Sequence, residues 1–221
     1  MTLVCEHCGA PIVQGVGRTP RYCSGAHRVA AHRARQREQL AAAGVPVELR
    51  RMRRWTRWSR IRRGTAVTKL PLTVDGRAAS STDPSTWATW DRAQRSRFGT
   101  GLGFVLAGDG VLAFDLDECV DEHGAVSAPA QDLLRTLPRT WVELSPSGRG
   151  LHVWGYGTVG KGRRFVTAGG LRVELYDRGR FVTVSGRPVV LAPLADVGQA
   201  LALLELDAAD SLGGWKARES A

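Results

Sequence analysis

The feature that most constrains this chain is a series of short apolar runs after Gly101, each bounded by residues that favour turns. In several runs polar and apolar side chains alternate, which is the period of a β-strand with one buried face. Gly, Asp, Ser and Pro residues separate the runs. The pattern predicts a sheet-based domain, with strands within residues 103–107, 111–114, 140–144, 171–176 and 180–186.

Two of these strands are expected to form a β-hairpin, because Gly108-Asp109-Gly110 lies between them and its glycines can supply the positive φ of a tight turn. A helix is expected from Pro129 to Leu137, and a second helix, rich in Leu and Ala, from Ala192 to Leu206. Residues 207–221 are expected to be a flexible tail.

An acidic pair ends the strand at residues 111–114, which continues directly into Asp115-Leu116-Asp117. Side chains alternate along a strand, so Asp115 and Asp117 share one face. Two carboxylates so close repel each other unless a cation neutralises them, and oxygen ligands favour Mg²⁺ or Mn²⁺. A pair of such ions suits nucleotidyl transfer. The motif alone leaves open a Ca²⁺ loop, a sugar-nucleotide transferase or exposed polar residues.

Two later segments can complete such a site. Glu174 alternates with apolar neighbours in its strand and offers a third carboxylate. The loop before His152 combines hydroxyls, glycines and an arginine, which suits a triphosphate, although an ordinary hairpin loop remains the alternative. The residues of this expected phosphate loop are Ser145, Ser147, Gly148, Arg149 and Gly150.

A metal-binding pattern occupies the N-terminus, where three of the four cysteines have the spacing Cys5-x2-Cys8-x14-Cys23 and His27 follows after three further residues. Thiolate and imidazole are the ligands that tetrahedral Zn²⁺ prefers, and they let a short segment fold without its own core. The triplet at residues 22–24 resembles that of short zinc knuckles in bacterial and phage proteins. His7 and His32 are alternative fourth ligands.

The positive charge is concentrated at one end of the chain. Residues 1–64 hold 14 Lys and Arg and 3 Asp and Glu, a net of +11, whereas the other residues hold 17 and 18, a net of −1. Such a segment is typical of phosphate-backbone binding. Trp55 and Trp58 are expected either to stack on bases or to join the core. The expected nucleic-acid contacts are Arg28, Arg33, Arg35, Arg37, Arg53, Arg54 and Arg57.

The order of these pieces resembles the bifunctional primase-polymerase domain of phages and plasmids, within the archaeo-eukaryotic primase superfamily. The resemblance covers Trp55 to Gly186. It implies an α+β fold with an RRM-like mixed or antiparallel sheet and flanking helices. It also implies that the acids Asp115, Asp117 and Glu174 bind divalent metal and that His152 contacts the phosphates of the incoming nucleotide. Lys69 and Arg180 are further candidates for nucleotide binding.

The expected organisation is a zinc knuckle at residues 1–27, a basic helix and linker at 28–50, and a primase-polymerase domain at 51–206. The expected partners are a single-stranded DNA template, nucleoside triphosphates and a replicative helicase. The helicase is expected to be a separate protein, because Gly162 replaces the hydroxyl residue that a Walker A loop needs for nucleotide hydrolysis. A cytoplasmic protein without a membrane span is expected. The alternative function is a non-catalytic zinc-knuckle factor that binds nucleic acid during replication.

Overall fold

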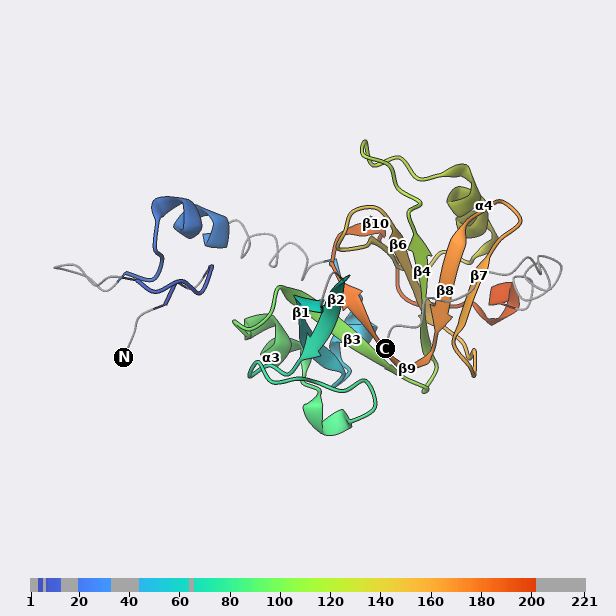
Figure 1. The fold of residues 1–221 in the computed structure, drawn as a ribbon. Helices are drawn as coiled ribbons and strands as arrows, with labels where there is room; N and C mark the ends of the chain where they lie inside the picture. Colours follow the sequence, from blue (N-terminus) through green and yellow to red (C-terminus); the bar gives the residue numbers. More distant parts are fainter. Residues whose placement is uncertain (1–3, 6, 13–19, 33–43, 64–65, 202–221) are drawn as a thin grey trace. The chain divides into compact units, whose positions relative to one another are not determined.

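The computed structural model describes residues 4–5, 7–12, 20–32, 44–63 and 66–201. The chain divides into two compact units, Met1–Ala43 and Gly44–Ala221 (Figure 1). The second unit is a mixed α+β structure with antiparallel sheets and few helices, which confirms the expected class. Within the described residues, no helix has the length and apolar character needed to span a membrane.

The first unit is a small turn followed by a helix. The Cys5 amide donates to Ala10 O, and Gly9 in the turn between them has a φ of +73°. Residues 25–32 are helical, and Ser24 Oγ accepts a hydrogen bond from the His27 amide near the start of the helix. The helix therefore begins before Arg28. Residues 33–43, which include Arg33, Arg35 and Arg37, lie outside the described residues.

The second unit contains four described helical segments and one 3₁₀ turn in addition to its strands. The helices are α2 (Val47–Arg50), α3 (Trp90–Arg95), α4 (Ala128–Thr136) and a segment that begins at residue 198, and the 3₁₀ turn is η1 (Pro84–Thr86). The strands are β1 (Trp55–Arg63), β2 (Ala66–Leu72), β3 (Gly101–Ala107), β4 (Val111–Asp117), β5 (Val142–Leu144), β6 (Leu151–Tyr156), β7 (Arg163–Val166), β8 (Arg172–Tyr176), β9 (Arg178–Val184), β10 (Pro188–Val190) and β11 (Ala195–Asp196).

The strands form two sheets. The smaller sheet has the order β2-β1-β3-β9, and the larger has the order β10-β5-β6-β4-β8-β7 with β11 beside β6. All the pairings are antiparallel except that of β11 with β6. The chain passes from one sheet to the other between β3 and β4, between β8 and β9, and between β9 and β10. The first two crossings are joined by a hydrogen bond from the Gly108 amide to Asp177 O.

The predicted hairpin of residues 103–107 and 111–114 is therefore wrong. Its two strands belong to different sheets, since β3 pairs with β1 and β9 while β4 pairs with β6 and β8. Gly108 and Gly110 do adopt positive φ, but the turn redirects the chain into the second sheet. A local turn signal does not specify which strand becomes the hydrogen-bonding partner.

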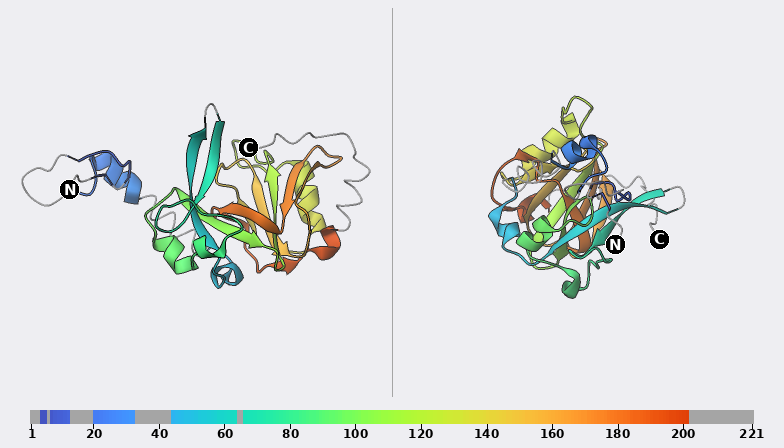
Figure 2. Two further views of the ribbon diagram at one scale, coloured as in Figure 1. Left: turned by 60° about the horizontal axis from the view of Figure 1, so that its bottom comes forward. Right: turned by 90° about the vertical axis from the view of Figure 1, so that its left-hand side faces the viewer.

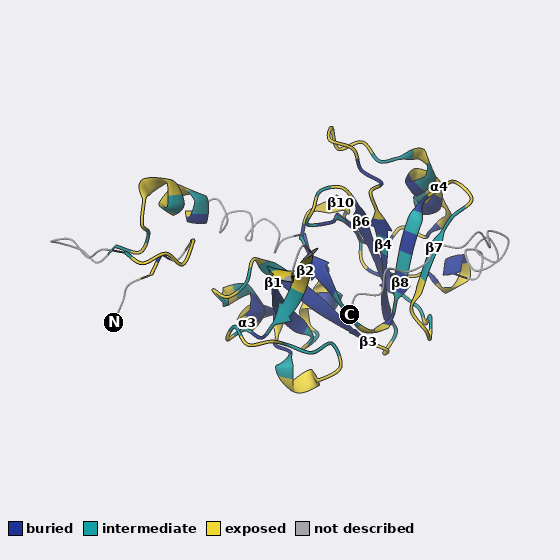
Figure 3. Ribbon diagram, in the orientation of Figure 1, coloured by how far each residue is buried: buried dark blue, intermediate teal, exposed yellow. Residues whose placement is uncertain are grey.

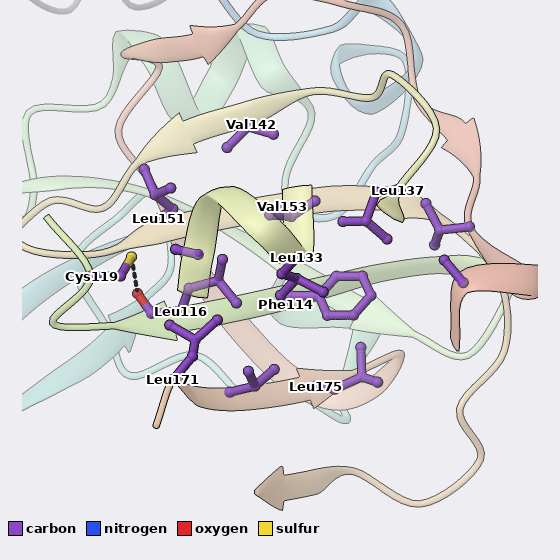
Figure 4. Close-up of a cluster of buried hydrophobic side chains, with 14 of the residues drawn as sticks. Phe114, Leu116, Cys119, Leu133, Leu137, Val142, Leu151, Val153, Leu171 and Leu175 are labelled. Atoms are coloured by element: carbon purple, nitrogen blue, oxygen red, sulfur yellow. Dashed lines mark hydrogen bonds between the residues drawn. The ribbon is translucent and has the colours of Figure 1, made fainter. Parts of the chain in front are cut away.

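Helix α4 covers one face of the larger sheet. Phe114 and Leu116 of β4 point toward it and pack with Leu133 in a buried cluster (Figure 4). The intervening residues of β4, Asp115 and Asp117, point to the opposite face. The expected helix from Pro129 to Leu137 is thus confirmed within one residue. It fixes which face of the sheet stays open for chemistry.

The two sheets meet through an aromatic cluster. Trp55 contacts Phe104 with ring centroids 5.1 Å apart, and Phe104 contacts Trp154 of the larger sheet at 5.8 Å. Both contacts are edge-on, the geometry that aromatic quadrupoles favour. Trp55 and Trp58 are 0% and 5% exposed, so they are core residues rather than stacking platforms. The pattern of buried positions is visible in Figure 3.

The basic segment is also divided by the fold. Of its fourteen arginines, the eight from Arg50 to Arg63 lie in the second unit, and four of these belong to β1. Arg57 is only 3% exposed and donates to the carbonyl oxygens of Phe98 (2.7 Å) and Ala93 (3.4 Å). The nucleic-acid contact expected of Arg57 is excluded by this burial. Arg54 pairs with Asp109, whereas Arg53 is exposed.

The C-terminal part differs from the expected helix over Ala192–Leu206. Ala195 and Asp196 form β11, and the helix begins only at residue 198. The side chain of Asp196 accepts from the Gly198 amide at 2.8 Å, which satisfies a free donor at the helix start. Residues 202–221, including the predicted tail, lie outside the described residues.

We predict that Arg57→Ala lowers the free energy of unfolding by about 2–3 kcal/mol, because the buried carbonyl of Ala93 and the partly buried carbonyl of Phe98 lose a charged donor. The matched variant Arg60→Ala, on the exposed part of the same strand, is expected to change it by less than about 0.5 kcal/mol. Urea denaturation of both variants measures the difference. Equal stabilities would contradict the structural role of Arg57.

Candidate active site and metal centre

Five charged or titratable residues lie directly opposite one another across five strands of the larger sheet. The register pairs Glu143 with His152, His152 with Asp115, Asp115 with Glu174 and Glu174 with Arg164. Directly opposed residues in antiparallel strands point to the same face. We call this set the charged row. It lies on the face opposite α4, and Asp117 follows two residues beyond Asp115.

His152 is held between two carboxylates of this row. Its Nδ1 lies 3.1 Å from Glu143 Oε1, and its Nε2 lies 3.6 Å from Asp115 Oδ1. Burial by itself lowers the pKa of the imidazole, but the charge of Asp115 and the hydrogen bond to Glu143 raise it above its ordinary value. Both carboxylates thus favour the charged form of the ring, and Glu143 does so through a direct hydrogen bond. With 1% exposure, His152 sits behind Asp115.

Glu143 is the functional residue that sequence reasoning missed. Its carboxylate is fully buried, and Oε2 accepts from the amides of Ser185 (2.9 Å) and Gly186 (2.8 Å) and from Ser185 Oγ (3.0 Å). A buried carboxylate persists only with such compensation. Glu143 thus fixes His152 and also joins the end of β9 to β5. The sequence signal that could have identified Glu143 is a single acidic residue between the apolar residues Val142 and Leu144.

Asp115 and Asp117 experience mutual repulsion. The pKa of Asp117 is raised to about 6 by desolvation and by the charges of Asp115 and Glu174. A bound divalent cation would relieve this repulsion, and carboxylate oxygens are the ligands that Mg²⁺ and Mn²⁺ prefer. The residues present therefore fit such an ion.

Glu174 is placed beside Asp115 as expected, but its carboxylate is already paired. Arg164 Nε lies 3.0 Å from Oε1, and Arg180 lies 3.1 Å from Oε2. Tyr176 Oη also donates to it at 3.0 Å. The predicted alternation is confirmed, since Val173 and Leu175 are buried. A third carboxylate ligand at this position has to compete with two arginines.

A cavity of about 530 Å³ opens between the two sheets beside Asp115 and Glu174 of the charged row. Asp115 and Glu174 line it from the larger sheet, while Lys69 and Thr183 line it from the smaller one. Lys69 Nζ lies 3.4 Å from Thr183 Oγ1. Arg180, at the start of β9, also lines the cavity. We call this space the inter-sheet cavity; it brings together carboxylates and cations from four strands.

The expected phosphate loop is a tight β5–β6 turn. Ser145 is 6% exposed, and its Oγ accepts from the Gly150 amide at 3.2 Å. A Cβ on Gly150 would lie 2.5 Å from Leu116 O, so glycine is required there by packing. Ser145 and Gly150 therefore hold the turn and are removed from the expected phosphate contacts. Ser147 and Arg149 are exposed, and neither they nor Gly148 line the inter-sheet cavity.

A second site lies in the first unit, where Cys5, Cys8, Cys23 and His27 place their ligand atoms within 4.8 Å of one another. Among the described residues this is the one group that meets that criterion. Cys8 Sγ and Cys23 Sγ are 3.7 Å apart, which is too long for a disulfide and close to the edge, about 3.8 Å, of a tetrahedron with Zn–S bonds. His27, rather than His7 or His32, completes the group.

The thiols of this cluster have strongly perturbed acidities. Desolvation opposes ionisation of Cys5, but backbone donors including those of Cys23 and Cys8 lower its pKa to about 6. Desolvation and the neighbouring thiols Cys8 and Cys5 raise the pKa of Cys23 to about 11. Three thiol groups converge on one point, and a bound cation would let all of them ionise.

We predict that both Asp115→Asn and Glu143→Gln lower the pKa of His152, because each removes a negative charge or an acceptor that stabilises the imidazolium. A metal-free NMR titration of the imidazole C–H resonances, assigned with His152→Gln, measures the change. An unchanged midpoint in Asp115→Asn would contradict the proposed coupling.

We predict that Asp117→Asn stabilises the metal-free protein at pH 7.5. Because the folded-state pKa of Asp117 lies above its ordinary value, stability from this group is present below about pH 4 and is lost as the pH rises through 6. Solvent screening keeps the gain near 1 kcal/mol, or about 2–4 °C in Tm.

Thermal unfolding with a chelator at pH 7.5 and pH 5 tests this prediction, with Glu118→Gln as the control. Mg²⁺ or Mn²⁺ should raise the Tm of the wild type more than that of Asp117→Asn. A variant less stable than the wild type at pH 7.5 would refute the repulsion.

Comparison with known proteins agrees with this geometry. A family model described as the N-terminal domain of bifunctional DNA primase/polymerases matches residues 37–195. The chain is also 38% identical over 146 residues to a DNA primase-polymerase of Nitratiruptor phage NrS-1, and the match covers 62% of this chain and 20% of that protein. The chain thus spans about a fifth of the curated relative's length. Since the family model matches well over half of this chain, the chain belongs to the family of bifunctional DNA primase/polymerase N-terminal domains.

Proposed function

We propose that this chain catalyses template-dependent nucleotidyl transfer, as a DNA primase and DNA polymerase in phage or plasmid replication. The observation that carries the proposal is the charged row, which sets Asp115 and Glu174 side by side at the floor of the inter-sheet cavity. The family membership supports the class of reaction, and the position of the two acids supports the inter-sheet cavity as the place where the reaction occurs.

In this proposal Asp115, Asp117 and Glu174 hold two Mg²⁺ or Mn²⁺ ions, which would supply Lewis-acid stabilisation of the attacking and leaving oxygens. Lys69 and Arg180 line the inter-sheet cavity, where they attract the triphosphate. His152 is 1% exposed and does not line the inter-sheet cavity, so in this proposal its Nε2 positions the Asp115 carboxylate and does not make the direct phosphate contact that the resemblance implied. Glu143 keeps that nitrogen in position from behind.

We further propose an RRM-like core for the larger sheet. Its support is the order β5-β6-β4-β8, in which the strand before α4 lies centrally between the third and fourth strands of the core. The segment at residues 155–162 ends β6 and leads into strand β7 rather than a helix, so this segment lacks the helix N-terminus of a nucleotide-hydrolase loop. We also propose that a replicative helicase opens duplex DNA for this domain.

The nucleotidyl-transfer test uses the full chain with unprimed single-stranded DNA, Mg²⁺ or Mn²⁺, and either ribo- or deoxyribonucleoside triphosphates. Asp115→Asn and Asp117→Asn are expected to reduce product at least about 100-fold, because each removes a charged ligand. Glu118→Gln, which changes an exposed neighbouring acid paired with Arg172, should retain activity within about twofold. Folded wild-type protein that forms no product on any template would refute the proposal.

The alternative is a non-catalytic factor that binds nucleic acid during replication. The observation in its favour is that Arg164 and Arg180 already neutralise Glu174. The two functions differ in metal affinity. A polymerase should bind Mn²⁺ more tightly when a triphosphate is present, whereas the non-catalytic factor should bind DNA with no such dependence.

We propose that Cys5, Cys8, Cys23 and His27 bind one structural Zn²⁺. Metal analysis of the purified chain should find about one Zn²⁺ per molecule, and Cys23→Ser should lose it. A chelator strong enough to remove Zn²⁺ should increase amide exchange within residues 1–32 while leaving the strands of the second unit protected. Zinc-free wild-type protein with protected residues 20–32 would contradict this assignment.

A further inference from the structure

The β1–β2 hairpin extends beyond the sheet that anchors it. β1 pairs with β3 only from Trp55 to Trp58, whereas its pairing with β2 continues from Arg57 to Arg63. The outer half is therefore a two-stranded ribbon, which projects from the second unit in both views of Figure 2. Such ribbons contribute little stability by themselves. Its sequence is thus free to serve another purpose.

One face of this ribbon is cationic and open to solvent. Arg60 lies opposite Lys69, and Arg62 lies opposite Val67, so these four side chains share a face. All four are exposed, and Val67 is 61% exposed, whereas Ser59, Ile61, Thr68 and Leu70 on the other face are half-buried. We call Arg60, Arg62, Val67 and Lys69 the hairpin face.

The hairpin face continues into the inter-sheet cavity. Val67, Lys69 and Pro71, which alternate along β2, all line that cavity together with Asp115 and Glu174. Arg60 and Arg62 do not line the cavity themselves, but they lie directly opposite Lys69 and Val67 and so continue the same face along the hairpin. A nucleic-acid strand that enters the cavity along β2 would pass both arginines.

The charges of the hairpin face are not compensated within the described part of the chain. Arg54, Arg164, Arg172 and Arg180 all pair with carboxylates, but Arg60 and Arg62 form no ion pair there. Lys69 lies directly across from Arg60, and like charges in such a position destabilise a hairpin. This arrangement favours a polyanionic ligand that spans several cations.

We propose that Arg60 and Arg62 bind the phosphate backbone of the single-stranded DNA template as it enters the inter-sheet cavity. This inference deepens the proposed function and rests on it for the identity of the strand. The exposed Val67 between the cations offers an apolar contact to a sugar or base. The inference also moves the main nucleic-acid contact of β1 from Arg57, which is buried, to the outer half of the strand.

The test measures the affinity of the full chain for a fluorescently labelled single-stranded oligonucleotide by anisotropy, over a series of KCl concentrations. The double variant Arg60→Ala/Arg62→Ala is compared with Arg92→Ala/Arg95→Ala, which removes the same charge from two exposed positions of α3. A third variant, Arg60→Lys/Arg62→Lys, retains the charge. Thermal unfolding confirms that all three variants are folded.

Each single-strand phosphate contact contributes about 0.7 to the slope of log K against log salt concentration. The hairpin variant should therefore lose about 1.4 from the slope and bind roughly 10- to 30-fold more weakly at 0.1 M KCl. The lysine variant should keep most of the slope. The α3 variant should bind like the wild type.

The outcomes separate this inference from the proposed function. If the wild type makes no product but only the hairpin variant loses affinity and slope, nucleotidyl transfer fails and the binding surface stands. If the hairpin and α3 variants lose affinity equally, or neither does, the inference is overturned whatever the catalytic result. Loss of affinity for an acidic peptide but not for DNA would assign the hairpin face to a protein partner, and would also overturn it.

Discussion

The arrangement of this site depends on the register of five antiparallel strands. The pairing of β5, β6, β4, β8 and β7 sets Glu143, His152, Asp115, Glu174 and Arg164 side by side on one face. A slip of one residue in any strand would turn its member of the row into the core under α4. The apolar residues between them, such as Phe114 and Val173, oppose that slip because they are buried against the helix. Burial of apolar residues on one face of the sheet thus fixes the register that aligns the charged residues on the other face.

The charged row is also an electrostatic balance. The buried carboxylate of Glu143 is offset by three donors and an imidazole, and Glu174 is offset by two arginines. The repulsion between Asp115 and Asp117, which lies just beyond the row, is the least compensated, as the raised pKa of Asp117 indicates. A cation-binding site has to keep such uncompensated negative charge while no cation is bound. The ion pairs of Glu143 and Glu174 on either side limit this uncompensated charge to Asp115 and Asp117.

The second sheet converts this open face into a site. The aromatic contacts of Trp55, Phe104 and Trp154 hold the two sheets together at one end, and the inter-sheet cavity opens beside the charged row. The arginine-rich segment takes three structural roles as a result. Arg57 supports the core, Arg54 pairs with Asp109, and Arg60 and Arg62 face solvent beside the cavity.

The amino-acid sequence by itself determined the elements whose signals are local. The alternation around Asp115 and Glu174, the helix that became α4 and the spacing of the metal cluster could all be predicted, because periodicity and ligand spacing act within a few residues. The same local view led to a hairpin between β3 and β4 and left open whether Trp55 stacks on bases or joins the core. Only the tertiary structure decided which strands pair, since hydrogen-bonding partners come from distant segments. It therefore decided that Glu143 stands behind His152, that Ser145 and Gly150 hold a turn, and which arginines remain exposed.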